Sequence, residues 1–271
     1  MDIIVRESYA EMSRYAAEVI AGYIKAKPNC VLGLATGSTP IGTYQELVRM
    51  HKEGLDFSNV KTFNLDEYYG VGIDLNKPFD LDQSYARFMY ENLFKHINIK
   101  PENVHVPDGL TKEPEKYCRW YEDEIVKAGG IDLQVLGIGG DGHWAFNEPG
   151  SSLGSRTRLQ ALTPQTLDDN YESFYKKAGI AREDMPHFAL TMGIGTILEA
   201  KNIIMLANGK KKADVVAKSI EGPITSQITA SAIQLHSGGV TVVLDRDAAS
   251  SLNNLEYYMH VEKLKRDYGF C

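Results

Sequence analysis

Three residues able to exchange protons stand close together in VLGIGGDGHWAFNEP, residues 135–149. Asp141, His143 and Glu148 place an imidazole between two carboxylates, which can orient and tune a group that titrates near neutral pH. The glycines before and among them leave the backbone free to take positive φ and to approach a ligand closely. This stretch therefore predicts a site of proton transfer.

A metal site is the main alternative for the same residues, because aspartate, histidine and glutamate all bind divalent ions. Their spacing does not match the H-E-x-x-H helix register, and the surrounding glycines favour a loop over that helix. No G-x-G-x-x-G opens a helix after the first predicted strand, residues 30–35, which argues against a dinucleotide site there. We expect proton chemistry on an anionic metabolite, without a metal or an organic cofactor.

A separate acid follows a second strand-like segment. Residues 60–65, VKTFNL, are succeeded directly by Asp66 and Glu67. In α/β sheets, ligands bind beyond the carboxyl ends of the strands, and a carboxylate there can take a proton from carbon. Asp66 is therefore a candidate base, with an exposed loop acid as the alternative.

A candidate anion-binding loop follows the first predicted strand. Thr36, Gly37, Ser38 and Thr39 stand immediately before Pro40, a residue suited to the first position of a helix. Unpaired N–H groups and the helix dipole favour a phosphate at such a helix start. A capped turn is the alternative, since Ser and Thr also cap helices.

Two groups of cations are further candidates for holding an anion. Lys212 ends an N-G-K-K-K run where a predicted strand gives way to a helix, and cations there oppose the helix dipole unless an anion is bound. Arg156 and Arg158 alternate in a predicted strand, which would place both on one face. A solvated basic surface is the alternative for each group.

Composition indicates an ordinary globular protein. The chain has 271 residues, 43% of them hydrophobic, and a formal net charge of -7. The negative charge argues against a nucleic-acid partner, and the N-terminus resembles neither a membrane anchor nor a secretory signal. Three widely spaced cysteines favour a reducing compartment. We expect a cytoplasmic protein that binds a small molecule, with a homo-oligomer compatible with the sequence.

The order of elements predicts the fold class. Apolar strand-like runs alternate with amphipathic helices, and no linker or internal repeat interrupts them. We expect an α/β fold, a largely parallel sheet with helices on both faces, formed by residues 1–271 as a single domain. Helices are expected over about 8–27, 40–54, 83–96, 115–128 and 248–266, and further strands at 104–106, 132–137, 187–192, 203–207 and 240–244.

Four motifs together resemble the glucosamine-6-phosphate deaminase family, within the glucosamine/galactosamine-6-phosphate isomerases. They are LATGSTP at 34–40, FNLDEY at 63–68, GIGGDGHWAFNEP at 137–149 and SSLGSRTR at 151–158. The similarity covers nearly the whole chain and includes ALTMGIGTIL at 189–198. It implies the family's modified Rossmann-like fold, which is shared with 6-phosphogluconolactonases.

The resemblance also implies a reaction. Asp66 matches the base that moves a proton from C2 to C1 of the opened amino sugar, and Asp141, His143 and Glu148 match the residues that open its ring. Hydrolysis of the resulting C2 imine releases ammonia and fructose 6-phosphate. On this basis the chain is expected to be an isomerising deaminase of the hydrolase type.

By the same resemblance, the 36–39 loop and Lys212 match the family's phosphate site. The chain departs from the family pattern at Glu172, where relatives often carry a phosphate-contacting arginine. Trp144 stands where a smaller aliphatic residue is usual, and the 70–82 segment, expected to be a surface loop or lid, is longer than in many relatives. Both differences are expected to reshape the pocket mouth.

A regulatory site is expected to be lost. Ser151 and Arg158 match the second site at which allosterically activated relatives bind N-acetylglucosamine 6-phosphate. Gln160 and Ala161 stand where such relatives carry a lysine and a threonine, so one cation and one hydroxyl are missing.

Three other functions remain open. A galactosamine-6-phosphate deaminase or isomerase differs at one sugar hydroxyl that these residues do not resolve. A 6-phosphogluconolactonase-like hydrolase would need no base for a C2 proton, so Asp66 favours the deaminase. A sugar-phosphate-binding regulator would not need the full set of acid and base groups.

Overall fold

The computed structural model describes residues 1–71, 83–176 and 179–270. Most of the loop expected at 70–82 therefore lies outside the described residues, as does Cys271. The main sheet is entirely parallel and follows the order β1-β10-β9-β6-β2-β3-β5. Its strands are β1 (Asp2–Arg6), β10 (Gly239–Asp245), β9 (Asn202–Ala207), β6 (Leu133–Leu136), β2 (Val31–Leu34), β3 (Lys61–Asn64) and β5 (Val104–His105).

Helices cover both faces of this sheet because successive strand residues point to opposite sides. Met205 belongs to one apolar cluster and Leu206 to the other. One cluster receives α1 (Tyr9–Ala26), α2 (Ile41–Lys52) and α3 (Tyr85–Asn92). The other receives α4 (Pro114–Lys127), α6 (Ile194–Leu198), α7 (Ala213–Glu221) and α8 (Arg246–Ala249). The predicted α/β class is confirmed.

The first helix shows how local sequence sets an element. The Ser8 side chain caps α1 by accepting a hydrogen bond from the backbone N–H of Glu11, as the capping spacing predicts. Met12, Ala16 and Ile20 then recur at helical spacing and are fully buried against the sheet.

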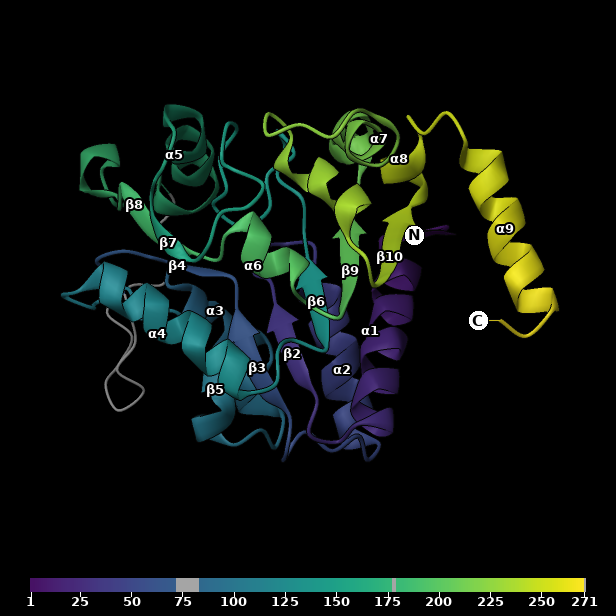
Figure 1. Ribbon diagram of the computed structural model, residues 1–271, viewed down its shortest axis with the longest axis horizontal. Helices are drawn as coiled ribbons and strands as arrows, with labels where there is room; N and C mark the ends of the chain where they lie inside the picture. Colours follow the sequence, from purple (N-terminus) through teal and green to yellow (C-terminus); the bar gives the residue numbers. More distant parts are fainter. Residues whose placement is uncertain (72–82, 177–178, 271) are drawn as a thin grey trace.

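A second, three-stranded antiparallel sheet lies beyond the carboxyl ends of the main strands (Figure 1). It contains β4 (Asp66–Tyr68), β8 (Phe188–Thr191) and β7 (Arg158–Ala161), and α5 (Pro164–Asn170) lies near it. Asp66 is paired with Thr191 in this sheet, so it lies in a strand rather than in the loop expected from the sequence.

Other sequence expectations also need correction. Arg156 lies before β7, so the two arginines do not share a strand. The single helix expected at 248–266 is two helices, α8 and α9 (Leu255–Asp267). The break is stabilised by Glu221, whose carboxylate accepts the backbone N–H groups of Asn253 and Asn254. The edge strand β1 was not predicted.

Among the described residues, no helix combines the length and the apolar composition needed to cross a membrane.

Candidate active site

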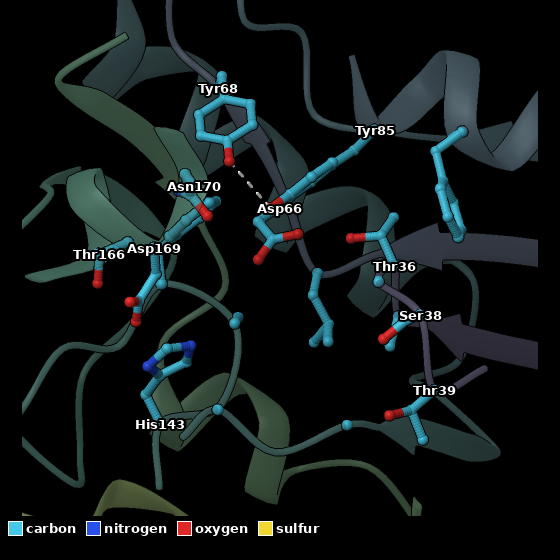
Figure 2. A pocket seen from close by; sticks show the side chains of 18 of the residues that line it. Thr36, Ser38, Thr39, Asp66, Tyr68, Tyr85, His143, Thr166, Asp169 and Asn170 are labelled. Carbon is cyan, nitrogen blue, oxygen red and sulfur yellow. Dashed lines mark hydrogen bonds between the residues drawn. The ribbon is translucent and has the colours of Figure 1, made fainter. Parts of the chain in front are cut away.

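A cavity of about 390 Å³ opens at the carboxyl ends of the central strands. The predicted anion loop follows β2, Asp66 follows β3, the His143 loop follows β6 and Lys212 follows β9. All four line the cavity, and Figure 2 shows Asp66, His143 and the hydroxyls of the loop around it. Parallel strand order brings these distant segments together, and the volume suits a small metabolite.

The anion loop lies at the N-terminus of α2, and each of Thr36, Gly37, Ser38 and Thr39 lines the cavity. Gly37 has a φ of 99°, which favours glycine. Among the described residues no side chain caps α2 at Pro40, so the capped-turn alternative is not what forms. The loop is held by the Thr39 hydroxyl, which donates to Asn208 Oδ1 at 2.8 Å.

Lys212 is the half-buried cation of the cavity wall, positioned by the short 3-10 turn before α7. Burial lowers its pKa, and the negative charges of Asp141 and Asp169 act against that shift. An ammonium that is partly shielded from water and lies in the same cavity as the anion loop can bind a phosphate through a strong, charge-assisted hydrogen bond.

His143 is paired with Asp141, whose Oδ1 lies 2.6 Å from the imidazole Nδ1 and also accepts the His143 backbone N–H at 3.1 Å. Partial burial acts to raise the Asp141 pKa, but the hydrogen bond and charge of His143 outweigh it, and the pKa lies below its usual value. A Cβ at Gly139 would stand 2.4 Å from the imidazole, so only glycine leaves room for this ring.

Glu148 completes the cluster from a buried position, with 3% of its surface exposed. Its carboxylate accepts the backbone N–H of Thr163 at 3.1 Å and the Thr163 hydroxyl at 3.3 Å. Ligand-type atoms of Asp141, His143 and Glu148 all lie within 4.8 Å of one another. The structure thus brings the three predicted residues together, and of these His143 lines the cavity.

Trp144 does not shape the pocket mouth, contrary to the expectation from sequence. Its side chain is fully buried, and its indole N–H points to the sulfur of Met205 at 3.4 Å. Asn147 anchors the same loop by donating to the carbonyls of Trp144 and Met192, at 2.9 and 2.8 Å. Ala145, at a φ of 50°, takes the left-handed conformation that lets the chain turn beside His143.

Asp66 is 6% exposed and its carboxylate reaches into the cavity (Figure 2). Burial, reinforced by the neighbouring charge of Glu67, raises its pKa well above the usual value. Tyr85 also lines the cavity, and its hydroxyl donates to that of Tyr68 at 3.3 Å. A desolvated carboxyl facing a cavity is a suitable base.

Comparison with known proteins agrees with this geometry. Residues 5–243 match the model of the family described as glucosamine-6-phosphate isomerases/6-phosphogluconolactonase. The chain belongs to this family. It is 50% identical to a glucosamine-6-phosphate deaminase of Thermoanaerobacter sp. (strain X514) over 92% of this chain and 94% of that one. It is 48% identical to a glucosamine-6-phosphate deaminase of Clostridioides difficile (strain 630), over 95% and 99%.

Solved structures show the same fold. A structure described as a monomeric glucosamine-6-phosphate deaminase superposes with a TM-score of 0.85 at 43% identity, over 93% of this chain and all of that one. A 6-phosphogluconolactonase from Trypanosoma cruzi gives a TM-score of 0.70 at 23% identity, over 93% and 97%. The second likeness supports the family's fold alone.

In this family member the two predicted arginines serve internal contacts. Arg156 pairs with Glu199 and Glu122. Arg158 donates to Asn147 Oδ1 at 2.9 Å and to Ser151 Oγ at 3.1 Å. Neither arginine lines the cavity.

Glu172 does not take over a role in the cavity either. Its side chain is 64% exposed and pairs with Lys176 at 2.9 Å.

Two features of the site were missed from the sequence. Glu67 is fully buried and accepts hydrogen bonds from Ser84 and three backbone N–H groups. One face of α5 lines the cavity with Thr166, Asp169 and Asn170. Their i, i+3, i+4 spacing was the available signal for the second feature. For Glu67, three of the four donors come from Ser84, Tyr85 and Ala86, a segment distant in the sequence, so no local pattern indicated them.

Proposed function

We propose that this protein converts glucosamine 6-phosphate and water into fructose 6-phosphate and ammonia. The observation that carries the proposal is that Asp66 and His143, a carboxyl and an imidazole from two different strand ends, face one cavity with an anion loop. The family relatives named glucosamine-6-phosphate deaminase support the same substrate.

The phosphate is bound first in this scheme. The backbone N–H groups and hydroxyls of the 36–39 loop and the ammonium of Lys212 form the anion subsite. Holding this end places the sugar ring over Asp66 and His143. The reacting carbons are then held in a fixed orientation toward the base, which lowers the entropic part of the barrier.

Ring opening requires a proton to leave the anomeric hydroxyl and another to reach the ring oxygen. His143 faces the cavity and can exchange protons with both oxygens, while Asp141, 2.6 Å from its Nδ1, holds the imidazole in place. Glu148 completes the negative surroundings of the imidazole. The product of this step is the open-chain aldehyde.

Asp66 then removes the C2 proton, and the electron pair forms a C1–C2 double bond as the aldehyde oxygen gains a proton. Return of the proton to C1 leaves a C2 imine. Water adds to C2, the carbon–nitrogen bond breaks, and ammonia leaves with the fructose 6-phosphate. The hydrolytic character of the reaction lies in this last step, and no metal or organic cofactor takes part.

A galactosamine 6-phosphate substrate is the second candidate, since it passes through the same steps. The lactonase is disfavoured because it has no need of a base at C2, whereas Asp66 reaches into the cavity. We further propose a cytoplasmic location and one domain over residues 1–271. Cys30 and Cys118 support the reducing compartment, since both are free and buried.

Ammonium release from purified protein tests the proposal. Glucosamine 6-phosphate should yield ammonium and fructose 6-phosphate in equal amounts. Galactosamine 6-phosphate and 6-phosphogluconolactone serve as parallel substrates. Turnover of the lactone without ammonium from either amino sugar would reject the deaminase.

A further inference from the structure

One wall of the cavity is a polar helix face that the scheme above leaves without a role. Thr166, Asp169 and Asn170 line the cavity from α5. Figure 2 draws this wall on the same side as His143, with Asp66 between it and the hydroxyls of the anion loop. In this view the wall lies on the His143 side of the cavity and across from the 36–39 loop, and the charge of Asp169 also acts on Lys212.

The position of α5 is coupled to the catalytic cluster. Thr163 caps the helix by accepting the backbone N–H of Thr166 at 3.2 Å, and the same residue donates to Glu148. Gln165 donates to Asp169 Oδ1 at 2.9 Å, which orients the carboxylate. Asp169 is thus a directed acid on a helix whose start is fixed to the site.

Substrate geometry assigns a group to this wall. The C2 proton must point to Asp66, and C1, which carries the oxygens of ring opening, must lie at His143. The chain from C3 to C6 runs toward the anion loop and Lys212. The remaining substituent of the tetrahedral C2 is its nitrogen, which is left to face α5.

We infer that Asp169 binds the ammonium group at C2 of the substrate and selects amino sugars over their hydroxyl counterparts. The inference rests on the proposed function, because it uses the orientation that Asp66, His143 and Lys212 impose. Asp169 is the acid of this wall that lines the cavity. A carboxylate binds an ammonium by a charge-assisted hydrogen bond that a hydroxyl does not reproduce.

A different role for Asp169 predicts the opposite result. Its charge acts on Lys212, so the alternative role is to hold the ammonium of that lysine before substrate binds. Removing the charge would then tighten the binding of every sugar phosphate. If Asp169 instead recognises the amine, removing its charge would weaken the binding of amino sugars only.

Calorimetric titration with two open-chain inhibitors separates these roles. The probes are 2-amino-2-deoxyglucitol 6-phosphate and glucitol 6-phosphate, measured at pH 7 with wild type, Asp169→Asn and Asp168→Asn. Asp168 is the matched control, since it lies on the same helix, carries the same charge and pairs with Arg182. Wild type should prefer the amine by roughly tenfold, the lower end expected for a charge-assisted hydrogen bond.

In Asp169→Asn the ratio of the two dissociation constants should fall to about one. Glucitol 6-phosphate should bind as tightly as before or more tightly. Asp168→Asn should keep the wild-type preference. An unchanged ratio in Asp169→Asn, or equal tightening of both ligands, would overturn the inference. Ammonium release by wild type is measured separately, so an active enzyme with an unchanged ratio refutes the role of Asp169 alone. An inactive wild type refutes the proposed function.

Discussion

Glu67 accepts a 2.8 Å hydrogen bond from the hydroxyl of Ser84, and this contact joins β4 to the start of α3. The same carboxylate accepts the backbone N–H groups of Tyr85 and Ala86 at 3.1 and 3.0 Å. Tyr85 lines the cavity. The buried Glu67 side chain, which does not itself line the cavity, thus positions Tyr85, which does.

Replacing Glu67 by glutamine should therefore impair both stability and substrate binding. Both carboxylate oxygens accept hydrogen bonds from N–H groups, so the amide nitrogen must face donors it cannot satisfy. We expect a loss of about 1–3 kcal/mol in the free energy of unfolding and a raised KM. Denaturant unfolding and steady-state kinetics measure the two effects. Glu172→Gln, at an exposed glutamate, is the control and should change little; equal effects would contradict this role.

Asp66→Asn should fold and bind but lose turnover by about two to four orders of magnitude, because an amide cannot accept the C2 proton. It should also melt at a higher temperature than wild type. The raised pKa means that the folded protein opposes ionisation of this carboxyl, so its charge destabilises the fold at neutral pH. Solvent-isotope incorporation at C1 of the product and thermal unfolding are the measurements. Normal exchange in the variant would remove Asp66 from the mechanism.

The pH dependence of kcat/KM should show an acid limb set by Asp66. Because its pKa is raised, the carboxyl takes up a proton at a higher pH than an ordinary aspartate, and the base is lost as the pH falls through that value. Asp141 has a lowered pKa and stays ionised over the same range. The limb should therefore lie well above the usual aspartate value of about 3.9. A limb at the usual value would exclude Asp66 as the titrating group.

Lys212→Ala should weaken substrate binding through the phosphate. Loss of one charge-assisted hydrogen bond of about 1.5–3 kcal/mol corresponds to a rise in KM of roughly 10- to 150-fold. Unphosphorylated glucosamine should be affected far less. Lys211→Ala is the control, since this neighbouring lysine is exposed. If both substrates suffer equally, Lys212 does not bind the phosphate.

N-Acetylglucosamine 6-phosphate should leave the kinetics unchanged, and substrate saturation should be hyperbolic. The Arg158 guanidinium already donates hydrogen bonds to Ser151 and Asn147. Gln160, which stands where activated relatives carry a lysine, supplies no positive charge and instead accepts the Arg158 Nε–H at 3.1 Å. Without that cation, most of a typical coupling energy of about 1–3 kcal/mol is lost. Saturation curves with and without the ligand decide the matter, and a sigmoidal curve made hyperbolic by the ligand would contradict the prediction.

Much of the fold followed from local patterns. Apolar runs and helical spacing act over a few residues, so they predicted the strands of the main sheet other than β1, and the α/β class. The rule that parallel strands present their carboxyl ends at one edge then placed Asp66, His143 and Lys212 near one another. Asp141 and His143 stand two residues apart, and their pairing needed only a short loop.

Tertiary structure decided the rest, because the contacts involved join segments far apart in the chain. The sequence left open whether Asp66 would be exposed; pairing of β4 with β8 and burial by neighbouring layers made it a desolvated carboxyl. Trp144 stands beside His143 in sequence, yet the loop turns it into the core against Met205. The direction of a side chain and the water around it depend on the packed neighbours, and these exist only once the layers have assembled.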